Sequence, residues 1–150
     1  MLRRVIAFVV ALIVMVILGS IAHSLFVQAA WAQAAGMAEG APAALAMGDR
    51  VEWIAHDLVG LQPLFGALSA IALAGAFLTA GLVARFTGLR TIVFAVAGAV
   101  AIFALFTILK MVLGTVGVFG ARGMFGLGAQ MTAGLIAGLV FAMMTRPQQQ

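Results

Sequence analysis

The residues whose side chains could do chemistry gather in and beside two connections between apolar segments. His23 closes the first apolar segment, and His56 and Asp57 lie in the long connection that follows it. Lys110 and Arg122 belong to a glycine-rich stretch farther along the chain. Groups of these types can transfer protons, bind metal ions or hold an anionic headgroup. We expect them at the outer boundary of a membrane, where the candidate ligand-binding set is His23, Glu52, His56, Asp57, Lys110, Arg122 and Gln130.

Several of these residues have alternative interpretations. His23 and His56, predicted at matching depth on antiparallel helices, could ligate a haem between them. Glu52 and His56, spaced i and i+4, could instead supply two ligands to a metal ion, with a third from Asp57 or His23. The simpler interpretation makes them surface groups of an amphipathic helix, while Lys110 snorkels to the headgroups or pairs with an acid, Asp57 or Glu52. No second motif supports either site, so the sequence predicts no cofactor and no metal ion.

Glycine recurs at every third position between Lys110 and Gly128, at residues 114, 117, 120, 123 and 126. This period is typical of a compact, non-helical turn that packs against the outer rim of a helix bundle. Successive N–H groups could alternatively form an anion-binding nest, with Arg122 supplying the charge for a phosphate or lipid headgroup. The chain has neither a phosphate-binding loop motif nor GxSxG or HExxH, so we do not expect an enzyme.

The composition identifies lipid as the solvent of this chain. Of its 150 residues, 65% are hydrophobic and 8% are charged, whereas a water-soluble domain needs roughly a quarter charged residues. The absence of cysteine excludes disulfides, zinc thiolate sites, iron–sulfur clusters and thiol catalysis. The net charge of +4 comes from scattered Lys and Arg, which indicates membrane topology rather than a nucleic-acid surface. The excess of alanine and glycine suggests a bacterial protein.

Four apolar segments are long enough to cross a membrane, because about 20 helical residues span a hydrocarbon core of roughly 30 Å. The first also resembles a secretory signal with an A-x-A site at residues 30–32, but its apolar run exceeds the roughly 7–15 residues of such a signal. We therefore predict an uncleaved first span. The sequence predicts an all-α integral membrane protein, a four-helix bundle whose spans are about 5–27, 63–84, 91–113 and 125–144.

The external connection, 28–62, is expected to begin as a loose or partly helical segment and to end in a short interfacial helix at about 50–59. Its apolar positions repeat at helical spacing, opposite a polar side that contains Asp49, Glu52 and His56. Both tryptophans, Trp31 and Trp53, fall in this connection, at the headgroup level that indole prefers. A second, glycine-rich external turn is expected at 114–124.

Small residues spaced by four positions form ridges on the predicted spans. In lipid such ridges let helix backbones approach closely, because hydrophobic exclusion does not drive association there. The second span also carries a separate pair, Gly75 and Thr79. The residues predicted to pack helices together are Gly66, Ala70, Ala74, Gly126, Gly134 and Gly138.

Charge at the ends of the spans predicts the orientation. With four spans, five arginines lie on one side of the membrane and all four acidic residues on the other. The positive-inside rule then places both termini in the cytoplasm, here of a bacterial inner membrane. The five arginines are Arg3, Arg4, Arg85, Arg90 and Arg146.

The pattern favours a non-enzymatic accessory, assembly or stabilising subunit of a larger membrane complex. Its expected partners are membrane lipid and other membrane helices, in a homo-oligomer or a hetero-complex, and no nucleic acid. A lipid- or small-ligand-binding protein with a polar pocket at the outer leaflet is the first alternative. A minimal transporter or channel subunit is the second, although no titratable residue is predicted near the bilayer midplane, which argues against ion coupling.

Overall fold

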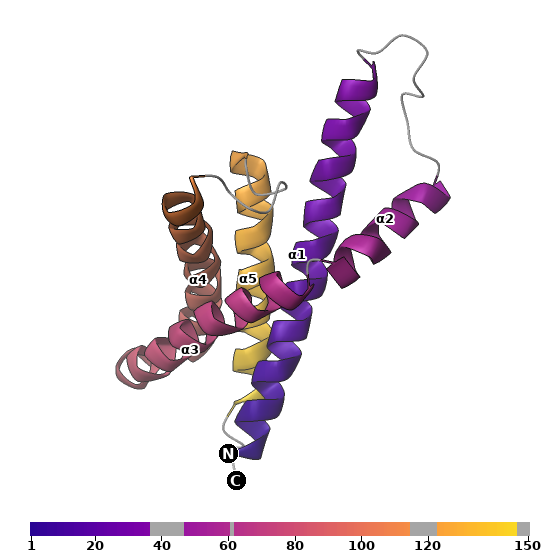
Figure 1. Cartoon of the computed structure of the whole chain (residues 1–150). Coiled ribbons are helices and arrows are strands. Elements are labelled where there is room, and N and C mark those ends of the chain that lie inside the picture. The colour runs from indigo at the N-terminus through magenta and orange to yellow at the C-terminus, as the bar shows by residue number, and fades with distance from the viewer. Residues whose placement is uncertain (37–46, 61, 115–122, 147–150) are drawn as a thin grey trace.

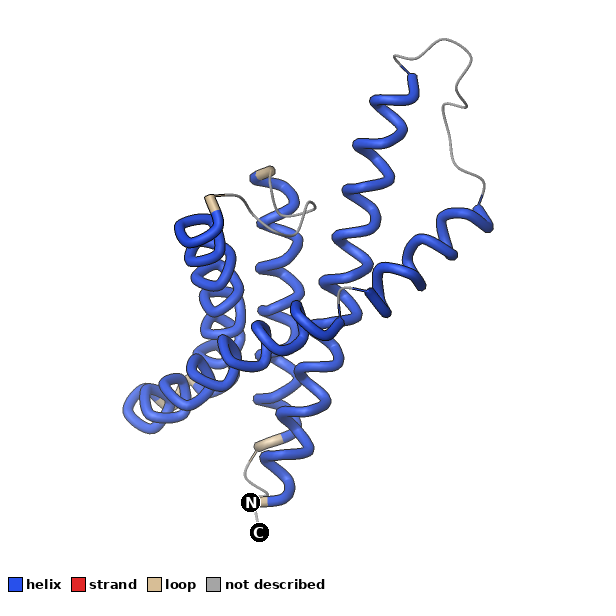
Figure 2. The backbone as a smooth tube through the Cα atoms, viewed as in Figure 1, coloured by secondary structure: helices blue, strands red, loops and turns tan. Residues whose placement is uncertain are grey.

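The computed structural model describes residues 1–36, 47–60, 62–114 and 123–146, apart from the side chains of residues 57, 58, 62 and 113. This part of the chain is helical and contains no strand (Figure 1, Figure 2). Four of its helices are long and apolar enough to cross a membrane, which confirms the predicted all-α fold with four spans. The helices are α1 (Leu2–Gly36), α2 (Met47–Gly60), α3 (Ala67–Thr87), α4 (Arg90–Leu113) and α5 (Met124–Met144), with a π-helical turn at Gln62–Gly66.

Helix α1 is longer than the sequence suggested. It runs for 35 residues, so residues 28–36, predicted as the start of a loose or partly helical connection, continue the first helix. Residues 28–36 carry alanine at most positions, and alanine is the best helix former, so nothing in them ends the helix. A helix of this length extends about 50 Å, well beyond a hydrocarbon core of roughly 30 Å. Figure 1 shows its C-terminal part projecting past the ends of α4 and α5.

Helix α2 packs beside this projecting part of α1. The side-chain amide of Gln28 donates a hydrogen bond of 3.2 Å to the carbonyl oxygen of Arg50. The rings of Trp31 and Trp53 meet edge to face with centroids 6.3 Å apart. Both tryptophans predicted at the outer interface therefore join α1 to α2. Residues 37–46, which connect the two helices, lie outside the described residues.

The four long helices form an open row in the order α3, α4, α5, α1. Helix α4 packs extensively on both α3 and α5, and α5 packs on α1, whereas α1 and α3 touch only slightly. The row is tightest between α4 and α5. A Cβ atom at Gly138 would overlap the carbonyl oxygen of Phe94 and lie 2.8 Å from its carbonyl carbon, and Gly98 and Gly134 oppose one another in the same way. The two backbones are thus in direct contact.

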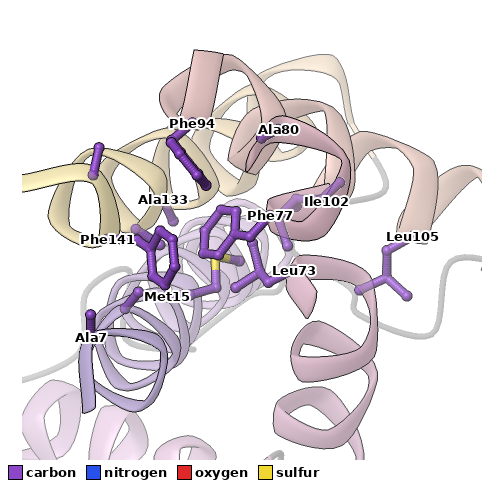
Figure 3. Packing of buried hydrophobic residues seen from close by; sticks show 14 of the residues in the cluster. Ala7, Met15, Leu73, Phe77, Ala80, Phe94, Ile102, Leu105, Ala133 and Phe141 are labelled. Carbon is purple, nitrogen blue, oxygen red and sulfur yellow. The ribbon is translucent and has the colours of Figure 1, made fainter. Parts of the chain in front are cut away.

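Four phenylalanines, one from each long helix, form the centre of the core. The rings of Phe77 and Phe141 stack with centroids 4.6 Å apart, and Phe94 lies 5.7 Å from Phe77 and 5.1 Å from Phe141. Phe8 meets Phe77 edge to face at 6.3 Å. Figure 3 shows three of these rings turned toward one another, with Met15 beside them. This aromatic cluster holds α3 against the rest of the bundle.

The ends of all four long helices lie on the side of the bundle where the chain begins. The guanidinium of Arg3 donates a hydrogen bond of 2.8 Å to the carbonyl oxygen of Met144, which ties the start of α1 to the end of α5. Helices α3 and α4 are joined there by a tight turn at Gly88, whose φ of 68° is left-handed and suits glycine. Leu2 and Met144 therefore lie at the same end of the bundle (Figure 1).

Candidate functional site

The structure places the predicted outer residues in different environments. Glu52 and His56 are exposed on α2, and Lys110 is exposed in the last turn of α4. The side chain of Asp57 and the whole of Arg122 lie outside the described residues. The exposed position of Lys110 fits the snorkelling interpretation, in which a long cationic side chain reaches the headgroups.

His23 and Gln130, by contrast, are buried inside the bundle. The side-chain amide of Gln130 donates a hydrogen bond of 2.9 Å to the carbonyl oxygen of Gly19, across the α1–α5 contact. A Cβ atom at Gly19 would come within 2.8 Å of the Gln130 Oε1 atom and 2.9 Å of the Phe65 ring, so a larger residue there would displace these side chains. Gln130 was predicted to bind a ligand, and in the structure its side chain joins α5 to α1.

These two residues are among the buried polar side chains of the described chain, most of which belong to α1. On α1 these side chains recur at i, i+3 and i+4, which places them along one side of the helix. The Oγ atoms of Ser20 and Ser69 and the Oε1 atom of Gln130 accept no hydrogen bond within the described part of the chain. Such buried oxygens suit a small donor molecule such as water. The buried polar side chains are Ser20, His23, Ser24, Gln28, Ser69 and Gln130.

Metal and haem binding gain no support from the described side chains. In the described part of the chain, no three His, Cys, Asp or Glu residues come together as a metal site. The two histidines of the haem alternative differ in environment, since His23 is only 8% exposed within α1 whereas His56 is exposed on α2.

A cavity of about 840 Å³ lies in the seam between α1 and α3, at the end of the bundle where α1 begins and α3 turns into α4. Its charged lining residues are Arg4 from α1, Arg85 from α3 and Arg90 from α4. Sequence reasoning used these arginines only to orient the chain. It missed the cavity because the separation of α1 from α3 depends on packing that no local pattern records. We call it the arginine-headed cavity.

A smaller cavity of about 320 Å³ continues along the same seam, between Val16 of α1 and the start of α3. Gly66 and Ala70 line this smaller cavity, and Ala74 lines the larger one. The predicted packing ridge on α3 therefore borders open space, and its small side chains leave room instead of drawing α1 close. The corresponding row on α5, at Gly126, Gly134 and Gly138, is buried.

Arg90 is the most constrained of the three arginines. Its Nη2 atom donates a hydrogen bond of 2.5 Å to the Thr145 hydroxyl, and its guanidinium carbon lies 4.8 Å from the centre of the Phe94 ring. Its Nε atom is buried and has no partner among the described groups. Arg4 is close enough to Arg90 to repel it electrostatically. Two like charges thus share one end of the cavity.

No protein-family model, curated protein or solved structure matches this chain. The class of protein is therefore defined by the fold alone, as a small multi-pass α-helical membrane protein.

Proposed function

We propose that this protein is a non-enzymatic accessory or assembly subunit of a larger membrane complex. It would lie in a bacterial inner membrane with both termini in the cytoplasm. Its partners would be other membrane helices, from its own copies or from a second protein. The observation that carries the proposal is an uncovered ridge of small residues on α3.

The α3 outer ridge consists of Gly75 and Thr79, and both residues are exposed. Apart from the backbone of α3 itself, no described atom lies within 4 Å of the position that a Cβ atom would take on Gly75. The hydroxyl of Thr79 donates a hydrogen bond of 2.9 Å to the Gly75 carbonyl oxygen, so its polar hydrogen is satisfied without a partner helix. Ile71 and Leu78, which are 73% and 79% exposed, flank the ridge with bulky apolar side chains.

A small ridge between bulky side chains suits helix association in lipid. Where water does not drive helices together, they associate through close backbone approach and van der Waals contact. The same kind of close packing occurs inside this protein, where the backbones of α4 and α5 meet at Gly98, Gly134 and Gly138. Helix α3 also has only one extensive neighbour, α4, which leaves its other side accessible to a partner.

Substituting leucine on the ridge tests this proposal. We expect Gly75→Leu to dissociate the complex without unfolding the protein, because the added side chain enters open space in the isolated chain. The complex would be extracted gently from the native membrane, and its size measured by native electrophoresis. Gly128→Leu is the matched control, since Gly128 is also exposed on a long helix and has nothing within 4 Å.

Wild type and Gly128→Leu should migrate as a complex much larger than one chain of 15.4 kDa in its detergent micelle, whereas Gly75→Leu should migrate as that single chain. A wild-type protein that is already a single chain, or a Gly75→Leu complex of undiminished size, would contradict the proposal.

A further inference from the structure

The arginine-headed cavity combines three features that suit a bound ligand. It is large, it carries three cations, and its walls are otherwise mostly apolar. A volume of about 840 Å³ is within the range of pockets that hold small-molecule ligands, roughly 300–1,000 Å³. Its walls include Phe8 of α1 and Leu78 and Leu82 of α3, so the cavity opens along the lipid-facing seam between these two helices.

Within the described part of the chain, no acidic side chain balances the charge of the cavity. No acidic residue lines it, and the acids of the described part, Asp49, Glu52 and Asp57, all belong to α2 at the other end of the bundle. No ion pair to Arg4, Arg85 or Arg90 forms among the described residues. Arg4 and Arg90 both line this cavity, and an anion bound there would offset the repulsion between their like charges.

The arginines also lie at the ends of candidate membrane spans, where lipid headgroups are expected. Arg4 is in the first turn of α1, and Arg85 and Arg90 flank the turn that joins α3 to α4. Below them the cavity is lined by aromatic and aliphatic side chains, which suit hydrocarbon. The cavity therefore presents cations at the membrane boundary and an apolar slot pointing into the bilayer.

We propose that the arginine-headed cavity binds one anionic phospholipid. Its phosphate contacts Arg4, Arg85 and Arg90, because guanidinium groups form charge-assisted, often bidentate hydrogen bonds with phosphate oxygens. One acyl chain occupies the seam between α1 and α3. A zwitterionic lipid fits less well, because its cationic headgroup would be repelled by three arginines. Neither ridge residue, Gly75 or Thr79, lines the cavity, although Leu78 borders both surfaces.

Lipid binding to the purified full-length protein tests the proposal. The protein would be delipidated in mild detergent and titrated with phosphatidylglycerol, with phosphatidylcholine or with inorganic phosphate, and bound lipid counted by native mass spectrometry. We expect one phosphatidylglycerol per chain, phosphatidylcholine binding about tenfold weaker, and no displacement of lipid by millimolar phosphate.

Two kinds of variant distinguish the contribution of the arginines, which bind the headgroup, from that of the apolar slot, which holds the acyl chain. Arg85→Gln and Arg4→Gln, both at exposed positions, should each weaken phosphatidylglycerol binding about tenfold. Arg146→Gln is the matched control, because Arg146 is at the same end of the bundle but does not line the cavity. Leu78→Trp should fill the slot and reduce binding while all three arginines remain. Leu78 is 79% exposed, so this change should not unfold the protein.

Several results would overturn the proposal. Equal affinity for phosphatidylcholine would show that the arginines do not select the headgroup. If Arg146→Gln lost as much affinity for phosphatidylglycerol as Arg85→Gln, the binding would reflect general attraction between an anionic lipid and a basic surface. Displacement by inorganic phosphate, or undiminished binding in Leu78→Trp, would show that the cavity holds a headgroup without its chain.

Discussion

Gly138→Ala should destabilise the protein by about 3 kcal/mol, although it adds one methyl group and alanine is the better helix former. The methyl group would be driven into the carbonyl group of Phe94 and would also lie 3.0 Å from the Cα atom of Ala95. Both neighbours are backbone, so no side chain can rotate away. Helices α4 and α5 would have to separate, which weakens the most extensive contact of the bundle.

The measurement is the free energy of unfolding in mixed detergent micelles. Gly128→Ala provides the comparison, because Gly128 is on the same helix and no atom lies within 4 Å of the added methyl group. We expect this control to be as stable as wild type or more stable by up to about 1 kcal/mol, from helix propensity. Equal stability of the two variants would mean that α4 and α5 do not meet at their backbones.

Phe77→Ala should cost about 4 kcal/mol, close to the loss for truncating a buried phenylalanine in a packed core. Phe77 is 5% exposed and contacts rings from each of the other three long helices, namely Phe8, Phe94 and Phe141. Its removal would leave a void at the point where α3 is held to the bundle. The same unfolding experiment measures this loss.

Phe86→Ala is the matched control for this truncation. Phe86 is on the same helix but is 84% exposed, so the same chemical change should alter stability by no more than about 0.5 kcal/mol. Similar losses in the two variants would indicate that α3 is not held by the aromatic cluster.

The four spans could be predicted from the sequence because each is a continuous apolar run of about membrane length. The extension of α1 was missed for a related reason. Hydropathy falls after Val27, which suggested that the helix ends there, but helix formation depends on backbone propensity, and the alanines of residues 28–36 maintain it. Hydropathy thus indicates where a helix leaves the membrane and not where it stops.

The candidate site was much less predictable. Small residues at four-residue spacing look the same in sequence whether they touch another backbone, as Gly138 does, or line a cavity, as Ala74 does. Only the positions of the neighbouring helices separate the two cases. The three arginines were visible as isolated charges, but their convergence depends on Arg4 being brought beside Arg90 from a distant part of the chain.

The central claim is that four helices cross a bilayer, with the arginine end in the cytoplasm and α2 outside. Because the chain has no native cysteine, single-cysteine variants can be labelled with a membrane-impermeant maleimide. Leu2→Cys and Phe86→Cys report on the arginine end, and Met47→Cys and Met124→Cys on the other; all four positions are at least 73% exposed. We expect the last two variants to be labelled in intact cells and the first two only after permeabilisation. Labelling of Leu2→Cys and Phe86→Cys from opposite sides of the membrane would contradict the account.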